Sequence, residues 1–322
     1  MTGGRGWRRI GRRRGTQAAS LVLAGWVLLA IFLEVLAAPA PLVARGKDGW
    51  WLPAVSAPER FATTAPAVVR SQFADQNAVY PLWPHGPETV TEAGPRAGPS
   101  WAHPLGTDHR ARDVWVRVLY GARVALSLAS LALAMALALG LPLGTIAGHL
   151  GAGWDDLLSR PLDLVHAVPT VVVVALVRVA SPDDSVAALA AAIGTVKAAE
   201  VARLVRAEVV QTGEEGFVLA ARALGADEVR LLRRHILPRA VRPALAAIPF
   251  GLASIVVLEA VTAFLGLGLP GSWGAMLAEG LDPSSPVVVP VAAATALGSV
   301  MLSCTAFFEV VNDAMDAPSS SH

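Results

Sequence analysis

The chain has 322 residues, of which 54% are hydrophobic and only 16% are charged, and its mean hydropathy is +0.53. This composition excludes an ordinary soluble domain and indicates an integral membrane protein. The net charge of +1 gives no general affinity for polyanions, so we expect no nucleic-acid partner. The single cysteine, Cys304, lies in an apolar run and excludes a disulfide framework or a thiolate metal cluster.

Six stretches of the sequence meet the requirement of about 20 mostly apolar residues for a membrane-spanning helix. They are residues 18–38, 124–147, 157–180, 186–204, 244–269 and 287–311. The third contains Arg160, Asp163 and Arg178. The fourth contains Lys197 and Glu200, and charges at this depth require polar partners or a cavity. The sequence therefore predicts an all-α integral membrane protein with six transmembrane helices in the lipid bilayer.

The stretch that precedes the first span, residues 1–17, is strongly basic. It contains six arginines: Arg5, Arg8, Arg9, Arg12, Arg13 and Arg14. Because cytoplasmic segments carry the excess of positive charge, we expect both termini in the cytoplasm, including the tail 313–322, and residues 39–118 outside. A cleaved signal peptide is the alternative, but the apolar stretch exceeds the roughly 7–15 residues typical of one. The predicted location is the plasma (inner) membrane, crossed several times.

The segment 39–118 is rich in proline and tryptophan. Trp50 and Trp51 suit a membrane–water interface, where aromatic side chains form belts. The Pro/Gly/Ala-rich run 81–99 is typical of an extended connector rather than of a packed domain. Further on, His103, Asp108 and His109 are metal ligands by residue type, but their spacing matches no recognised ligand set. We therefore expect a structural turn there and no metal site.

The most informative segment for function is the polar stretch 212–238, which lies between two apolar spans. Thr212 and Glu215 have the spacing of a capping box, which predicts the start of a helix. Gly225 suits the left-handed conformation that ends a helix, and Asp227 suits the start of a second one. Three basic residues then predict its last turn and Pro238 its stop. The stretch therefore predicts a helical hairpin suited to dock a cytoplasmic partner.

The hairpin and three further stretches carry a resemblance to a known family. In the hairpin, Ala220-Ala221 and Gly225 are followed by Ile-Leu-Pro at residues 236–238. The other stretches are HPLGTDHRARDVWVRVLYGARVAL at 103–126, ARLVRAEVV at 202–210 and LEAVTAFLGLGLPGSWGAMLAEG at 258–280. Together they resemble the second-type permease of oligopeptide and dipeptide ABC importers, a group that includes nickel importers. The resemblance is strong over residues 100–280, weak in the first and last spans and almost absent from 39–99.

The resemblance implies the type I ABC importer permease fold, with a core at 119–312 and a cytoplasmic coupling loop at 206–242. The residues then expected to dock on an ATPase subunit are Glu215, Ala220, Ala221, Gly225, Ile236, Leu237 and Pro238. One departure concerns Leu219, because the family normally has Glu before the two alanines. Either an ionic contact to the ATPase is missing, or the partner carries a matching apolar patch. Glu214 and Glu215, about one helical turn earlier, could partly substitute.

The resemblance also implies the partners of the chain. We expect a second permease subunit in a heterodimer, two cytoplasmic ATPase subunits and an extracytoplasmic substrate-binding protein. The sequence has no GxxxxGK[ST] loop, so ATP is expected on the partner ATPase, and this chain is expected to be no enzyme and to bind no cofactor. Di- or oligopeptides are the expected substrates, and nickel or another small solute is the alternative.

Ionisable residues in the spans are candidates for a translocation path. Glu259 and Asp163 match acidic residues of the family, and a helix–helix hydrogen bond is the alternative role for Glu259. Lys197 and Glu200 share a helix face, as do Asp163 and His166, so each pair is either a structural pair or part of a proton relay. A relay would favour a proton-coupled secondary transporter. A membrane hydrolase and a non-transporting membrane anchor are the remaining alternatives.

Overall fold

The computed structural model describes residues 3–315 except 47–48, 57, 62–63, 65, 75–76 and 181–184. It is mostly helical, and its residues form two compact units, which we describe separately. Unit 1 contains Met1–Ser20, Ser127–Leu258 and Leu302–His322, and unit 2 contains Leu21–Leu126 and Glu259–Met301. Most of the predicted C-terminal tail, 313–322, lies outside the described residues.

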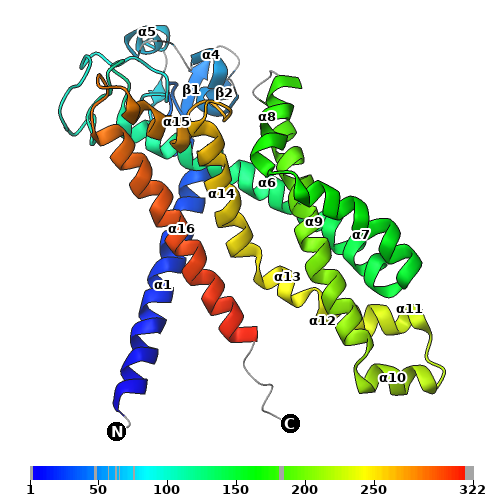
Figure 1. The fold of residues 1–322 in the computed structure, drawn as a ribbon. Helices are drawn as coiled ribbons and strands as arrows, with labels where there is room; N and C mark the ends of the chain where they lie inside the picture. The colour runs from blue at the N-terminus through cyan, green and yellow to red at the C-terminus, as the bar shows by residue number, and fades with distance from the viewer. Residues whose placement is uncertain are drawn as a thin grey trace. The chain divides into compact units, whose positions relative to one another are not determined.

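The N-terminal third combines one long helix with a small sheet and several short helices (Figure 1). The sheet has the strand order β2-β1-β3 with antiparallel pairing, and Ala44 of β1 lies opposite Trp51 of β2 and Ala78 of β3. The elements are α1 (Gly3–Ile31), α2 (Leu33–Leu36), β1 (Val43–Gly46), β2 (Gly49–Trp51), α3 (Pro53–Ser56), α4 (Pro58–Phe61), α5 (Pro66–Gln72) and β3 (Ala78–Val79).

The rest of the described chain is helical. Three of its helices, α6, α14 and α16, contribute residues to both units. The elements are α6 (Val114–His149), α7 (Ala152–Ala167), α8 (Thr170–Ala180), α9 (Val186–Gly213), α10 (Gly216–Ala223), α11 (Glu228–Leu231), the π-helical turn η1 (Leu232–Ile236), α12 (Leu237–Ala240), α13 (Arg242–Ala246), α14 (Ile248–Phe264), α15 (Trp273–Ala278), the 3-10 turn η2 (Glu279–Leu281) and α16 (Val288–Met315).

The helices agree with a membrane protein, but they differ from six continuous spans. Within the described residues, two helical stretches are long and apolar enough to cross a bilayer, Val114–His149 and Val288–Asn312. Two bent pairs raise the number to four if each is one span, Arg160–Ala167 with Thr170–Ala180 and Glu228–Ala246 with Ile248–Phe264. The apolar part of α1, Gln17–Ile31, is shorter. The count of six spans stays a prediction.

The predicted third span, 157–180, is not one helix, because the chain bends by 82° between α7 and α8. The break falls at Val168, whose φ of −80° and ψ of 125° are extended. The next residue, Pro169, has no N–H to donate and disfavours helical angles in the residue before it. The proline therefore accounts for the break in physical terms.

The segment 39–79 contains a packed core that the sequence did not predict. Phe61 and Phe73 are buried with several alanines, and the half-buried Trp51 packs against them. The ring centroids of Trp51 and Phe73 lie 6.1 Å apart. By contrast, residues 81–99 contain turns and isolated bridges but no regular helix or strand, which agrees with an extended connector.

Trp273 forms the centre of unit 2. Its side chain is fully buried, and its indole Nε1–H donates to the carbonyl of Val118 in α6 at 2.9 Å. A Cβ on Gly121 would lie 2.4 Å from the Trp273 ring, so this close approach requires glycine. Trp26 of α1 meets Trp273 edge-on at 5.4 Å and donates to Ser299 of α16 at 2.9 Å. One indole thus joins α6, α15 and α1.

A buried ion network fixes the loop before α6 in the same unit. Asp108 is fully buried and accepts from Arg112 at 2.7 Å and from Arg117 at 2.8 Å. Both arginines also donate to Glu279, and Arg112 donates to Glu88. Burial alone would raise the pKa of Asp108, but its hydrogen bonds and the arginine charges outweigh burial and lower the pKa. Asp108 is therefore ionised and fully committed to this network.

In unit 1, α6 and α9 approach each other along a row of glycines. Gly140, Gly144 and Gly148 recur every four residues, so they share one face of α6. A Cβ on Gly144 would lie 2.4 Å from the carbonyl oxygen of Ala202, and Cβ atoms on the other two would lie within 3 Å of α9. Small residues at this spacing allow two membrane helices to pack closely.

We predict that Gly144→Ala destabilises the protein, because the added methyl group would meet a backbone oxygen that cannot move freely. The expected loss is roughly 1–3 kcal/mol, the usual cost of overpacking. The matched control is Gly298→Ala in α16, where no atom lies within 4 Å of the added carbon. The measurement is the Tm of both variants in detergent, and equal Tm values would contradict the tight α6–α9 contact.

Candidate functional site

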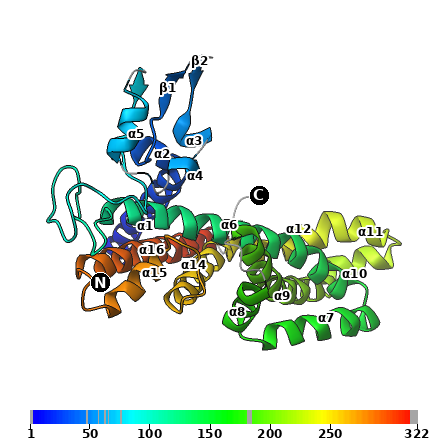
Figure 2. The same ribbon diagram turned by 90° about the horizontal axis from the view of Figure 1, so that it is seen from above.

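The polar stretch 212–238 forms two short helices, α10 and α11, that lie side by side in both views (Figures 1 and 2). Gly225 ends α10 with a φ of +82°, which confirms the predicted left-handed residue. The N–H of Gly225 donates to the carbonyl of Arg222, and that of Ala226 to the carbonyl of Ala221. This pair of hydrogen bonds is the Schellman arrangement, which satisfies the free carbonyls of a helix end.

The predicted capping box at the start of the hairpin is wrong. Thr212 lies in the last turn of α9, which continues to Gly213, and its side chain is buried. Glu215 occupies the N-cap position of α10 but makes no capping hydrogen bond with its side chain. It pairs instead with Arg239 of α12 at 2.5 Å. A long-range ion pair has therefore replaced the local cap.

The second helix starts as predicted but does not stop as predicted. Asp227 caps α11, because its carboxylate accepts the N–H of Arg230 at 2.9 Å. Pro238 does not end the helical run, since it occupies the first turn of α12 directly after η1. Within η1, the N–H of Leu237 reaches back five residues to the carbonyl of Leu232. A wide turn therefore precedes the proline, which has no N–H to donate.

Polar and aromatic contacts brace the hairpin on its exposed side. Arg222 of α10 and Glu228 of α11 form an ion pair at 2.5 Å. Arg239 lies over the ring of Phe217 at 4.7 Å, in addition to its contact with Glu215. Exposed ion pairs contribute little stability one by one, so their effect here is to fix relative orientation. Sequence reasoning missed Phe217 and Arg239, whose pairing over 22 positions leaves no local signal.

The predicted docking residues divide between the core and the surface of the hairpin. Ile236 is buried beside Val218 of α10, and Ala221 packs against the same apolar cluster. Ala220 and Pro238 are exposed, and Glu215 and Leu237 are half-buried. Packing inside the hairpin thus explains why residue 221 is small, but it does not explain the small residue at 220.

Three large apolar side chains of α10 and its C-cap are exposed beside the charged ones. Leu219, at the position where an acidic residue was expected, is 49% exposed. Phe217 is 42% exposed and Leu224 is 89% exposed. Large apolar side chains that are exposed to solvent close together are typical of a contact surface. Phe217 and Leu224 are seven residues apart and lie on one side of α10, whereas Leu219 lies on the other, so α10 exposes apolar side chains on both sides.

The two acidic path candidates lie in different environments. Asp163 is exposed on α7. Glu259 is only 1% exposed on α14, and among the described residues Ser272 is the one polar side chain near its carboxylate, although the two do not have regular hydrogen-bond geometry. A carboxyl group without regular hydrogen bonds in such a place is costly when ionised, which favours the packing role. A path role for either residue stays a prediction.

The charged pair of α9 lines a cavity of about 130 Å³ in unit 1. Lys197 donates to Glu200 at 2.8 Å, and Nδ1 of His166 lies 4.0 Å from the same carboxylate. The rest of the lining is mostly apolar and includes Phe250 and Ser254. His166 therefore faces Glu200, whereas Asp163 remains exposed, so the predicted Asp163–His166 pair is replaced by a cluster of three.

The segment 103–109 is built as a turn. Asp108 serves the arginine network, and His103 contacts Asp113 at 2.6 Å rather than either of its predicted companions. Side chains of a kind that bind metals also gather at Asp108, His109 and Glu279. Because two of these three carry arginine contacts, they are not free to act as ligands.

Comparisons with known proteins agree with this architecture. A family model described as "Binding-protein-dependent transport system inner membrane component" matches residues 140–317. A dipeptide transport system permease protein, DppC, of Alkalihalophilus pseudofirmus is 36% identical over 186 residues, which are 56% of this chain and 60% of the relative. An oligopeptide transport system permease protein, OppC, of Bacillus subtilis is 34% identical over 57% of this chain and 61% of the relative. The chain thus matches about three fifths of their length.

Solved structures show a likeness of fold. A chain of the MetNI methionine ABC transporter in an inward-facing conformation aligns with a TM-score of 0.52 and 18% identity, over 61% of this chain and 95% of that one. A chain of an amino acid ABC transporter crystallised with histidines aligns with a TM-score of 0.52 and 17% identity, over 62% and 94%. The family model covers more than half of the chain, so this protein belongs to the family of binding-protein-dependent transport system inner membrane components.

Proposed function

We propose that the chain is the transmembrane permease subunit of an ATP-driven importer of di- or oligopeptides. Family membership supports the transport role, and the names of the DppC and OppC relatives support the substrate class. The structural observation that carries the proposal is the helical hairpin. Two ion pairs connect its parts, and it exposes large apolar side chains. Nickel or another small solute is the alternative substrate.

In this proposal the hairpin is a mechanical coupling element. ATP binding and hydrolysis occur on two cytoplasmic partner subunits, and their movement is passed to α10 through its exposed side chains, which include Phe217, Leu219 and Leu224. The packed core of Val218, Leu231 and Ile236 then transmits the movement to α9 and α12. A second permease subunit completes the path, and an extracytoplasmic binding protein delivers the substrate.

The proposed topology has six spans with both termini in the cytoplasm. The broken pair α7–α8 would provide one span and α14 with the end of α13 another, and α1, α6, α9 and α16 the others. The arginine-rich N-terminus and the arginines of 206–242 support this orientation.

A proton-coupled secondary transporter is the second candidate. It is supported by the cluster of Lys197, Glu200 and His166 beside an apolar cavity, since titratable groups at such a place can relay protons. Uptake by the reconstituted permease in a pH gradient without ATP would favour this candidate over an ATP-driven importer.

The docking proposal predicts opposite phenotypes for neighbouring alanines. We expect Ala220→Trp to uncouple ATP hydrolysis from uptake while leaving Tm unchanged, because Ala220 is exposed. We expect Ala221→Trp to lower Tm by overpacking the core, at a cost of roughly 1–3 kcal/mol. Uptake, ATPase activity and Tm are measured on the reconstituted complex. Ala74→Trp, at another exposed alanine, is the control. Normal coupling in Ala220→Trp would refute the docking surface.

The topology predicts which exposed positions react with a membrane-impermeant maleimide. Single cysteines replace Leu82, Leu281 or Leu224, each of which is exposed, in a Cys304→Ala background. We expect labelling at the first two positions in intact cells and at the third only after the membrane is opened. Labelling of the Leu224 position from outside would invert the proposed orientation.

Glu259 distinguishes a packing role from a path role. Because its side chain is enclosed, we expect Glu259→Gln, which keeps the shape without the charge, to retain both uptake and Tm. Glu259→Ala should lower Tm by leaving a void, at a cost of roughly 2–4 kcal/mol. Uptake and Tm are measured for both variants. A loss of uptake in Glu259→Gln at an unchanged Tm would assign Glu259 to the path instead.

A further inference from the structure

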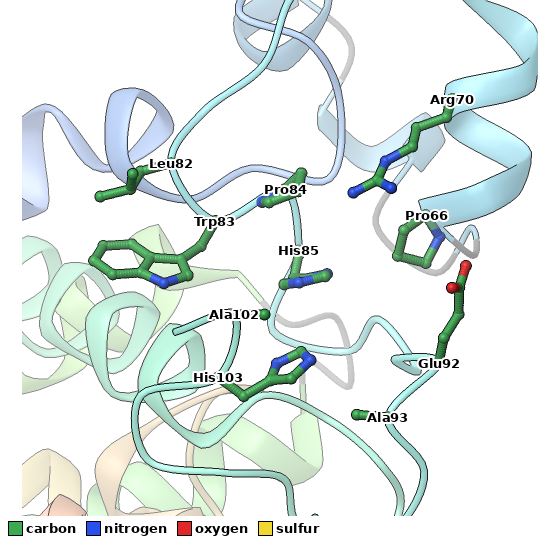
Figure 3. Close-up of a pocket in the computed structure, with 10 residues that line it drawn as sticks. All are labelled: Pro66, Arg70, Leu82, Trp83, Pro84, His85, Glu92, Ala93, Ala102 and His103. Carbon is green, nitrogen blue, oxygen red and sulfur yellow. The ribbon is translucent and has the colours of Figure 1, made fainter. Parts of the chain in front are cut away.

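Three potential metal ligands from separate parts of the chain meet in unit 2. His85 lies in the connector after β3, His103 lies in the turn before α6, and Asp113 directly precedes α6. All three are buried, and one donor atom from each lies within 4.8 Å of the other two. The two imidazole rings are stacked with centroids 5.1 Å apart (Figure 3). Sequence reasoning named His103 as a possible ligand but did not connect it with His85, which lies 18 positions earlier.

His85 has a polar atom that the rest of the described protein leaves unused. Its side chain is buried, yet its Nδ1 has no hydrogen-bond partner among the described residues. A buried nitrogen of this kind is unfavourable unless a ligand satisfies it.

Asp113 orients the second imidazole. Its Oδ2 contacts Nδ1 of His103 at 2.6 Å, and its Oδ1 accepts the N–H of Val116 at 3.0 Å, which fixes the carboxylate at the start of α6. The contact places two potential metal donors, Nδ1 of His103 and Oδ2 of Asp113, side by side. The aspartate can also bind the ion directly once a metal replaces the shared proton.

The group lies at a cavity with room for a further ligand. A cavity of about 230 Å³ is lined by His85 and His103, and Figure 3 shows Trp83 on one side and Arg70 and Glu92 on the other. The charge of Arg70 opposes a cation, but Glu92 and Asp113 contribute two negative charges that exceed it. The surroundings therefore accept a divalent cation.

We propose that His85, His103 and Asp113 bind one divalent transition-metal ion, with Zn²⁺ as the best match and a fourth position open to the cavity. Two imidazoles and one carboxylate suit Zn²⁺, which prefers four ligands and tolerates water as one of them. The ion would join the connector 81–99, through His85, to the turn at His103 and to Asp113 at the start of α6. The site is separate from the coupling hairpin, so it does not depend on the proposed function.

The test uses the full-length chain without a polyhistidine tag, stripped with EDTA and then loaded with Zn²⁺ or Co²⁺. After desalting, we expect one metal equivalent per chain by elemental analysis, visible Co²⁺ bands of a four-coordinate nitrogen and oxygen site, and a higher Tm with Zn²⁺. His85→Gln should weaken binding at least tenfold, because it removes one ligand. His109→Gln, at a nearby histidine outside the group, should bind like the wild type.

The variants separate loss of the site from loss of the fold. His85→Gln should keep the metal-free Tm, because Nδ1 of His85 gives up no hydrogen bond, and His85→Phe preserves the ring stacking if Gln does not fold. His103→Gln should also lose the metal but should lower the metal-free Tm, since it breaks the contact with Asp113. A wild-type chain that retains no Zn²⁺, or a folded His85 variant that retains as much as the wild type, would overturn the proposal.

Discussion

The structure depends on the absence of side chains along α6. Gly121 accepts the ring of Trp273 in unit 2, and Gly140, Gly144 and Gly148 accept the backbone of α9 in unit 1. Inside a bilayer the hydrophobic effect does not drive helices together. Close backbone contact and van der Waals packing must therefore supply much of the attraction. One helix thus provides the contact surface for both units, and each contact requires the smallest residue.

The polar groups outside the spans follow a different principle. Asp108 and its two arginines are buried but mutually satisfied, which makes them a fixed joint rather than a reactive site. His85 is buried and incompletely satisfied. The difference between satisfied and unsatisfied polar groups therefore separates structural clusters from candidates for binding or assembly.

The sequence predicted features that depend on neighbouring residues and missed those that depend on distant ones. The left-handed Gly225 and the cap at Asp227 are local choices of backbone, so residue type was sufficient. The capping role of Thr212 failed because α9 continues past it, and the partner of Glu215 lies 24 positions away.

The helices and the polar clusters show the same limit. Composition indicated a membrane protein, but it did not reveal that residues 157–180 bend by 82° or that His85 meets His103. Nor did it reveal the glycine row of α6 or the helix α9 that packs against it.

The π-helical turn before Pro238 has a consequence for the geometry of the hairpin. A turn that closes over five residues holds one residue more than a regular turn, and one residue corresponds to a rotation of about 100° around the helix axis. The side chains after Ile236 are rotated around the helix axis by this amount. The rotation places Arg239 over Phe217 and beside Glu215. The number of residues between Asp227 and Arg239 is therefore as strict a requirement as their identity, because a chain one residue shorter would turn the arginine away from both partners.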